Sequence, residues 1–426
     1  MSAELSPSAS TGPQSAADID AAAKRIAGVV TPTPLQLCDR LSAATGATVY
    51  LKREDLQTVR SYKLRGAYNL LVQLSDEEIS AGVVCSSAGN HAQGFAYACR
   101  ALGIHGRVYV PAKTPKQKRD RIRYHGGEFI ELIVGGSTYD LAATAALDDV
   151  ARTGATLVPP FDDPRTIAGQ GTIAVELLDQ LDDEPDLVVV PVGGGGCIAG
   201  IATYLAERTT NTAVLGVEPA GAAAMMAALA AGGPVTLEHV DQFVDGAAVN
   251  RAGTLTHAAL AAVGDMVSIT TVDEGAVCTA MLDLYQHEGI IAEPAGALSV
   301  AGLLEADIEP DSTVVCLVSG GNNDVSRYGE VLERSLVHLG LKHYFLVDFP
   351  QEPGALRRFL DEVLGPNDDI TLFEYVKRNN RETGEALVGI ELGSAAHLDG
   401  LLARMRATKL HVDTLEPGSP AYRYLL

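Results

Sequence analysis

The feature that most constrains the fold is an alternation of short apolar runs with helical patterns, from about residue 46 to residue 320. The apolar runs are GVVC (82–85), GRVYV (106–110), DLVVVPV (186–192), AVLGVE (213–218), MVSIT (266–270) and TVVCLVS (313–319). Near-continuous, valine-rich strands separated by helices are typical of parallel sheets with helices on both faces. Ligands bind such sheets beyond the carboxyl ends of the strands, so the strand-to-helix loops are the expected place for chemistry.

The pattern changes after about residue 342. Strand-like runs at 344–349, 370–376, 386–392 and 410–415 surround helical patterns at 352–365 and 397–407, and a turn is expected at 379–385. The order strand, helix, strand, strand, helix, strand describes a small two-layer α+β domain. We therefore expect a separate domain of about one hundred residues or fewer over 343–426.

The charge balance excludes two classes of partner. The 426 residues include 32 lysines and arginines against 54 aspartates and glutamates, which gives a formal net charge of −22. The field of such a chain repels a phosphate backbone and an anionic bilayer. Neither a nucleic acid nor a membrane is therefore expected as a partner.

Cysteine and histidine usage indicates a cytoplasmic protein without a metal site. The six cysteines lie far apart with no C-x-x-C pair, which suits reduced thiols, and the ten histidines include no H-E-x-x-H. Residues 1–16 lack the basic start and apolar core of a signal peptide. We expect these residues to form a loose N-terminal arm.

The first loop of interest contains Lys63, in SYKLRGAYN at 61–69, after the strand-like ATVYLKRED. A cation is electrostatically disfavoured at a helix start, so this lysine needs an explanation. One interpretation is a solvated lysine at a frayed helix end. The other is an amine that forms a Schiff base with a carbonyl, which needs a partly desolvated lysine on a rigid support.

Two further loops have the composition of anion sites. SSAGNHAQG at 86–94 places hydroxyls, an amide and free backbone N–H groups at a helix start, although a capped turn has similar composition. VGGGGCIAG at 192–200 places four glycines between a strand and a helix, where backbone N–H groups can converge on a phosphate. A flexible linker is disfavoured there because regular elements flank the loop.

The glycine loop has a rival interpretation. Gly194, Gly196 and Ala199 fit G-x-G-x-x-A, and Glu218 ends the next strand at about the spacing of a ribose-binding acid. This is the fingerprint of a nicotinamide-dependent dehydrogenase. It leaves Lys63, the 86–94 loop and a fourth loop, VSGGNND at 318–324, without a role.

A Schiff-base lysine, a phosphate loop and a carboxylate site together indicate pyridoxal phosphate acting on an amino acid. Six motifs closely resemble, in order, those of the threonine dehydratase family of fold type II (tryptophan synthase β-like) pyridoxal-phosphate enzymes: SYKLRGA, SSAGNHAQG, FDDPRTIAGQGTIAVEL, GGGGCIAG, EPAGA and SGGN. The resemblance implies an α/β catalytic domain at 17–335 with two open parallel-sheet subdomains, the smaller at about 56–155. The tail at 343–426 resembles, more weakly, the ACT-like regulatory domain of the same enzymes.

The resemblance also implies roles for individual residues. Lys63 would hold pyridoxal phosphate as a Schiff base and act as the catalytic base, Asn90 would contact its ring hydroxyl, and Ser319 would face its ring nitrogen. The phosphate would lie on the backbone of Gly193, Gly194, Gly195, Gly196 and Cys197. The substrate carboxylate would lie on Ser86, Ser87, Gly89, Asn90 and His91.

The implied activity is β-elimination of L-threonine to 2-oxobutanoate and ammonia, the first step of isoleucine biosynthesis. Family members are dimers or tetramers, and isoleucine, with valine opposing it, would act on the tail. Serine racemases have a serine where this chain has Ala88 and an acidic cation ligand where it has Ala224, so racemization and a metal requirement are disfavoured. An L-serine dehydratase and a catalytically silent amino-acid sensor stay open alternatives.

Overall fold

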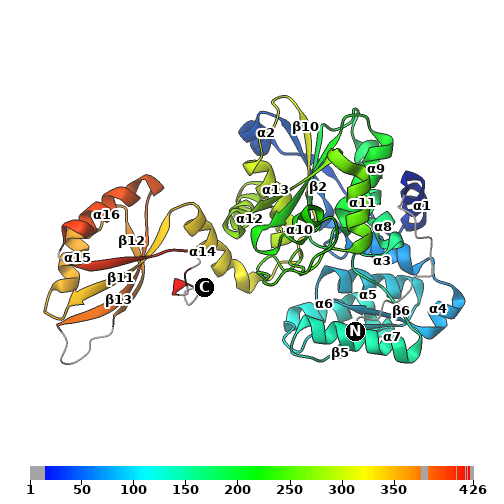
Figure 1. Cartoon of the computed structure of the whole chain (residues 1–426), viewed down its shortest axis with the longest axis horizontal. Coiled ribbons are helices and arrows are strands. Elements are labelled where there is room, and N and C mark those ends of the chain that lie inside the picture. The colour runs from blue at the N-terminus through cyan, green and yellow to red at the C-terminus, as the bar shows by residue number, and fades with distance from the viewer. Residues whose placement is uncertain (1–14, 376–381, 409, 418, 420, 423–426) are drawn as a thin grey trace. The chain divides into compact units, whose positions relative to one another are not determined.

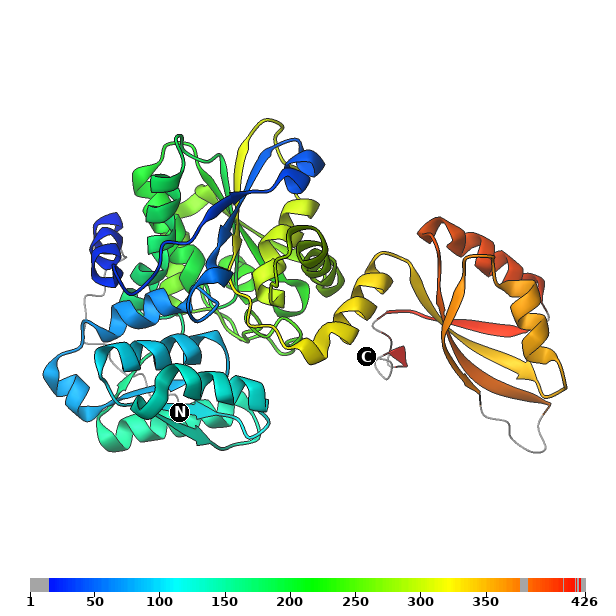
Figure 2. The ribbon, with the colours of Figure 1, turned by 180° about the vertical axis from the view of Figure 1, so that it is seen from behind.

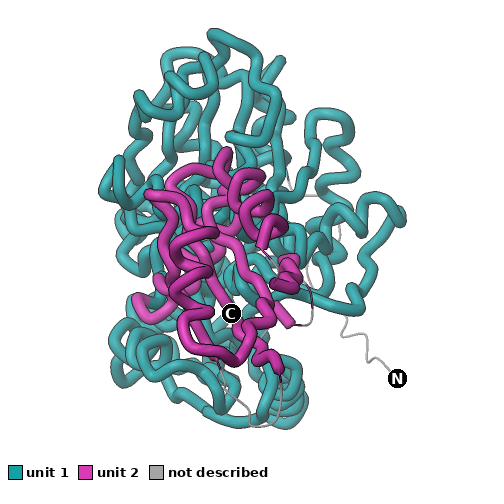
Figure 3. Tube along the Cα trace, turned by 90° about the vertical axis from the view of Figure 1, so that its left-hand side faces the viewer, with its two compact units in different colours: residues 1–324 teal, residues 325–426 magenta. Residues whose placement is uncertain are grey.

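A computed structural model of the chain describes residues 15–375, 382–408, 410–417, 419, 421 and 422. The arm expected at 1–16 lies outside this range except for Ser15, which caps helix α1 (Ala16–Ile26), and Ala16. Residues 379–381 of the expected turn at 379–385 also lie outside it. The chain forms two compact units, residues 1–324 and residues 325–426, coloured separately in Figure 3.

The larger sheet of the first unit has six strands in the order β1-β2-β10-β7-β8-β9. All neighbours are parallel except the edge strand β1, which runs antiparallel to β2. The strands are β1 (Leu35–Leu37), β2 (Thr48–Arg53), β7 (Leu187–Pro191), β8 (Ala213–Pro219), β9 (Val267–Val272) and β10 (Thr313–Val318). The parallel sheet expected from the valine-rich runs is confirmed, with an antiparallel edge that the sequence did not indicate.

Helices cover both faces of this sheet (Figures 1 and 2). Val188 and Val190 of β7 face a core shared with α8 and α9, and helix α13 packs on β7 and β10. Both faces of the strands are therefore buried, which explains their unbroken apolar runs. The helices are α2 (Asp39–Thr45), α8 (Pro164–Gln180), α9 (Gly196–Arg208), α10 (Ala224–Ala231), α11 (Thr254–Val263), α12 (Glu274–Glu288) and α13 (Pro294–Glu305).

The smaller sheet has four parallel strands in the order β5-β4-β3-β6. Its strands are β3 (Val83–Ser86), β4 (Gly106–Val110), β5 (Ile130–Val134) and β6 (Thr156–Leu157). Side chains of β3 alternate between a core shared with α3, α5 and α6 and a core shared with α7. The helices are α3 (Lys63–Leu71), α4 (Asp76–Ala81), α5 (Asn90–Leu102), α6 (Lys116–Gly126) and α7 (Tyr139–Thr153).

Glycines let α3 pack closely on α8, between the two sheets. A Cβ atom on Gly169 would come within 2.6 Å of the Arg65 carbonyl oxygen, and one on Gly66 within 2.8 Å of the Thr166 carbonyl oxygen. Neither side chain could be accommodated against backbone at such distances. The start of α3, where Lys63 lies, is therefore held at a fixed distance from α8.

The second unit has an antiparallel sheet in the order β12-β13-β11-β14, with α15 and α16 contributing to one core. Its elements are α14 (Tyr328–His338), β11 (Lys342–Pro350), α15 (Ala355–Val363), β12 (Asp369–Tyr375), β13 (Thr383–Glu391), α16 (Leu398–Ala407) and β14 (His411–Leu415). The order expected from the sequence after residue 342 is confirmed. Phe345, Phe349 and Phe359 lie at the centre of this core.

Replacement of Phe359 by alanine should destabilise the second unit alone. The ring is 2% exposed and makes an edge contact with Phe349, with centroids 5.2 Å apart. Truncation of such a buried phenylalanine costs about 3–5 kcal/mol. Hydrogen exchange followed by mass spectrometry should show faster exchange in peptides from 342–375 and unchanged exchange in unit 1. The control is Leu360→Ala, whose side chain is 41% exposed; equal effects of the two variants would contradict the prediction.

Candidate active site

Lys63 is the first residue of α3, as the sequence predicts. Its side chain is half-buried, and Nζ donates a hydrogen bond to the Pro160 carbonyl oxygen at 3.1 Å. Desolvation lowers the pKa of Lys63 to about 8, while Cys197 and Glu293 act in the opposite direction. An amine with this pKa is deprotonated in an appreciable fraction of molecules near neutral pH, as a nucleophile or base must be.

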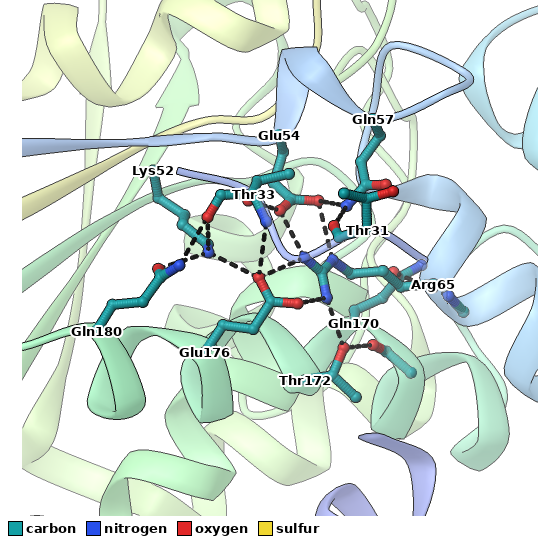
Figure 4. A network of polar contacts seen from close by, with 12 residues as sticks. Thr31, Thr33, Lys52, Glu54, Gln57, Arg65, Gln170, Thr172, Glu176 and Gln180 are labelled. Atoms are coloured by element: carbon teal, nitrogen blue, oxygen red, sulfur yellow. Dashed lines mark hydrogen bonds and ion pairs between the residues drawn. The ribbon is translucent and has the colours of Figure 1, made fainter. Parts of the chain in front are cut away.

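A buried network of charges holds the helix that carries Lys63 (Figure 4). Arg65 is fully buried and forms a bidentate pair with Glu54, with N–O distances of 2.9 and 2.7 Å. The same guanidinium donates to both carboxylate oxygens of Glu176, at 2.7 and 2.9 Å. Lys52 completes the network through Glu176 at 2.7 Å. Two cations therefore balance two carboxylates where β2, α3 and α8 meet.

The loop after β3 presents unpaired polar groups at the start of α5. The Oγ atom of Ser86 is buried without a hydrogen-bond partner, and the cap residue Gly89 offers no side chain to the first N–H groups of the helix. Ser87 Oγ accepts from the Gly89 N–H at 3.3 Å. A helix start with unsatisfied donors and an adjacent hydroxyl has the chemistry of an anion site.

His91 is held neutral. Burial, and then the charge of Lys63, lower its pKa to about 3. Its Nε2 atom lies 2.8 Å from the Val158 carbonyl oxygen, so this nitrogen carries the proton and donates. The imidazole is thus committed to Val158, and a contribution of His91 to a carboxylate site falls to its backbone N–H.

The glycine loop joins β7 to α9. Gly195 has φ +90° and caps α9 with no side chain on its first N–H groups. A Cβ atom on Gly194 would lie 2.3 Å from the ring of Phe161, and one on Gly193 would lie 2.9 Å from the Cα atom of Ala247. Packing on one side of the loop therefore requires glycine. The N–H groups at the start of α9 are free to bind a phosphate.

The acid of the dinucleotide fingerprint is not available to a ribose. The Glu218 carboxylate accepts from the backbone N–H groups of Met225 at 2.7 Å and Met226 at 2.8 Å, and its residue is fully buried. Desolvation raises the pKa of Glu218 to about 7. The expectation that Glu218 could bind a ribose, and with it the dehydrogenase interpretation of this loop, is wrong: the residue caps α10.

The four loops meet, and the glycine loop takes part through Cys197, which lies close enough to Lys63 to raise the pKa of the amine. The N–H of Tyr62 donates to the Ser319 carbonyl oxygen at 3.2 Å, and Asn90 donates to Glu293 at the start of α13. Ser319 Oγ donates to the Ala295 carbonyl oxygen at 3.2 Å. The sequence did not single out Pro160, Glu293 or Asn322 as contributors, although they lie within or beside the quoted motifs. Pro160, Glu293 and Asn322 therefore take part in the site, although the sequence analysis assigned them no role.

These residues fit pyridoxal phosphate. The unpartnered Ser86 hydroxyl, the uncapped glycine loop and the half-buried amine of Lys63 provide a carboxylate site, a phosphate cradle and a Schiff-base donor. Among the described residues, no cluster of three or more histidine, cysteine or acidic side chains could bind a metal ion. In the same part of the chain, no helix has the length and apolarity to cross a membrane.

Two parallel-sheet lobes that meet at a lysine and a glycine loop define the class of fold type II pyridoxal-phosphate enzymes. Residues 26–320 match the family described as "Pyridoxal-phosphate dependent enzyme", and residues 333–425 match the "C-terminal regulatory domain of Threonine dehydratase". The chain belongs to the pyridoxal-phosphate-dependent enzymes and, within them, to the family of biosynthetic threonine dehydratases.

Three similar proteins illustrate this relation. The chain is 90% identical to "L-threonine dehydratase biosynthetic IlvA" of Mycobacterium tuberculosis, with 100% of each chain covered. A threonine deaminase isoform from Solanum lycopersicum shares 36% identity and a TM-score of 0.69, over 78% of this chain and 98% of that one. Maize serine racemase gives 31% identity and the same TM-score of 0.69, over 77% and 99%.

Loss of the Arg65 charge should destabilise the first unit strongly. In Arg65→Met, the buried Glu54 and the partly buried Glu176 keep only Lys52 to balance them, and breaking a buried pair such as Arg65–Glu54 costs about 3–5 kcal/mol. Urea unfolding followed by circular dichroism measures the loss. The control is Lys116→Met, whose ion pair with Asp120 is exposed to solvent and contributes little to stability. A similar small loss in Arg65→Met would show that the network does not hold this junction.

Proposed function

We propose that this protein is an L-threonine dehydratase, which converts L-threonine to 2-oxobutanoate and ammonia in isoleucine biosynthesis. The observation that carries the proposal is the half-buried amine of Lys63 at the meeting point of a phosphate-type loop and a carboxylate-type loop. The names of relatives that are 86–90% identical over the whole chain support the choice of substrate.

Different groups of the chain bind different parts of the cofactor and of the substrate. Lys63 holds the cofactor covalently, the backbone N–H groups from Gly193 to Cys197 hold its phosphate, and Asn90 contacts its ring hydroxyl. Ser86, Ser87 and the backbone from Gly89 to His91 hold the substrate carboxylate. When bound, pyridoxal phosphate supplies a carbonyl for the substrate amine and an electron sink that acidifies the α-proton.

Lys63 then serves as the general base. Once released from the cofactor, its amine takes the α-proton of threonine, and its pKa of about 8 suits that transfer near neutral pH. The β-hydroxyl leaves as water, and the unsaturated product hydrolyses to the 2-oxo acid and ammonia. The phosphate of bound pyridoxal phosphate would supply the proton for the leaving hydroxyl, and the backbone N–H groups from Gly193 to Cys197 would hold that phosphate in place.

Ser319 favours elimination over competing reactions. A hydroxyl does not hold the ring nitrogen fully protonated as a carboxylate would, so a long-lived carbanion is less stabilised and the β-leaving group departs promptly. The Ser319 hydroxyl donates to the Ala295 carbonyl oxygen, and it would rotate away from this contact to donate to an unprotonated ring nitrogen.

We further propose the organisation and regulation of the enzyme. Residues 17–335 form the catalytic domain with a smaller subdomain at about 56–155, and 343–426 form an ACT-like domain that binds isoleucine, with valine as an opposing effector. A single such domain completes its effector site with a second copy, so the enzyme is a homodimer or homotetramer. All six cysteines are free and buried, which suits a cytoplasmic protein.

Replacement of Lys63 by alanine should abolish turnover and the visible absorbance of the bound cofactor, because the amine is lost. The fold should persist, since Lys63 contributes one hydrogen bond to Pro160 and no core packing. Release of 2-oxobutanoate from L-threonine, absorbance and circular dichroism are measured together, with L-serine as the competing substrate. The control is Lys116→Ala on exposed α6; more than trace activity in Lys63→Ala would remove the central assignment.

Isoleucine should raise the threonine concentration required for half-maximal rate, and valine should oppose it. A chain that ends at about residue 335 keeps the proposed catalytic domain with all four loops of the site and lacks the antiparallel sheet of the second unit. It should stay active and become insensitive to isoleucine. Rate curves with and without each effector test both chains. If the full-length enzyme neither binds isoleucine nor responds to it, the second unit has a structural role instead.

A further inference from the structure

We infer that Glu293 is a positioning residue, which orients the Asn90 amide so that it approaches the cofactor as a hydrogen-bond donor. The inference rests on the proposed function, in which Asn90 contacts the ring hydroxyl of pyridoxal phosphate. Glu293 is the first residue of the EPAGA motif and lies at the start of α13, in the other lobe of the first unit from Asn90.

Both the nitrogen and the oxygen of the Asn90 side-chain amide form a hydrogen bond. Its Nδ2 atom donates to Oε1 of Glu293, and its Oδ1 atom accepts from Asn322 Nδ2 at 2.8 Å. Asn322 Nδ2 also donates to the Val59 carbonyl oxygen at 2.8 Å, which fixes that amide. A flipped Asn90 would place N–H against N–H at Asn322 and oxygen against carboxylate at Glu293. The group left on the nitrogen is its second N–H, so Asn90 meets a ligand there as a donor.

The Glu293 carboxylate accepts from Asn90 and from the backbone N–H of Asn322, and it does not cap its own helix. Glu293 occupies the cap position of α13, yet its side chain makes no cap hydrogen bond. Its own N–H donates to the Gly320 carbonyl oxygen at 3.1 Å. A Cβ atom on Gly320 would come within 2.4 Å of Glu293 Oε1, so the backbone closes directly over the carboxylate. The carboxylate is therefore confined on the side of Gly320.

Burial of the Glu293 carboxylate is also unfavourable in free energy. Burial first, and then the charge of Asp245, raise the pKa of Glu293 to about 7, against the opposing effects of Asn90 and Lys118. Lys118 pairs with Asp245, and no lysine or arginine within the described part of the chain forms an ion pair with Glu293. A buried carboxylate without a cation in contact with it destabilises a fold, and groups of this kind gather at functional sites.

The test compares three holoenzymes with the wild type: Glu293→Ala, Asn90→Ala and the double variant. If Glu293 acts through Asn90, Glu293→Ala should lose cofactor about tenfold faster on dialysis, since one positioned hydrogen bond is weakened. Its cofactor absorbance should shift in the same direction as that of Asn90→Ala. The double variant should match Asn90→Ala within about twofold. Multiplied effects in the double variant, or wild-type absorbance in Glu293→Ala, overturn the inference.

Two further variants test whether the effect is specific to the contact between Glu293 and Asn90. Glu293→Gln retains an oxygen that can accept from Asn90, so it should lose cofactor more slowly than Glu293→Ala. Glu218→Gln alters another buried carboxylate, which contacts α10 and not Asn90, and should leave the absorbance unchanged; a shift there would overturn the specific role of Glu293. Wild-type absorbance in Asn90→Ala would instead reject the Asn90 assignment in the proposed function, and the inference with it.

Discussion

The bidentate pair between Arg65 and Glu54 is the interaction on which the arrangement of the site depends. It joins α3, which carries Lys63, to the residues that follow β2 of the large sheet, and Glu176 extends it to α8. All the cationic charge is matched inside the protein, because Lys52 balances the second carboxylate. Such a network contributes little net stability compared with apolar packing, but its geometry permits one placement of α3. The position of the Lys63 amine therefore depends on Arg65, Glu54 and Glu176, to which no ligand contact is assigned.

Much of the fold could be predicted because its strands and helices are determined by apolar runs and turn residues. Val188 to Val190 are buried on both faces of β7, so the run had to be a central parallel strand. The helical pattern at 352–365 was confirmed only in part: of its apolar positions, Phe359 and Val363 are buried in the second core and Leu364 packs against it, whereas Leu356 and Leu360 are each 41% exposed. The division of the strands between two sheets and the antiparallel β1 were not predicted from periodicity. These features depend on long-range pairing, which a local pattern does not encode.

The site was predictable where the sequence carries an unusual residue in an unusual place, and unpredictable where a common residue is unusual only in its surroundings. Lys63 at a helix start and four consecutive glycines are conspicuous. Glu293 and Glu218 are ordinary glutamates in the sequence, and only burial shows that their pKa values are raised to about 7. Nothing in the sequence distinguishes Arg65 from other arginines, yet it is fully buried. Burial of charge is a tertiary property that composition and spacing do not report.

The fold alone does not determine the reaction, because a serine racemase and a threonine deaminase match this chain equally well in structure. The difference must come from a few side chains around a shared cofactor site. Ala88 is one of them: it packs against the core of the smaller lobe and has no group that can carry a proton. In the proposed reaction Lys63 transfers the α-proton on one face, and Ala88 supplies no donor for re-protonation from the opposite face. Lys63 can return the proton only with retention of configuration, so at this position loss of the β-hydroxyl competes with that return and not with racemization.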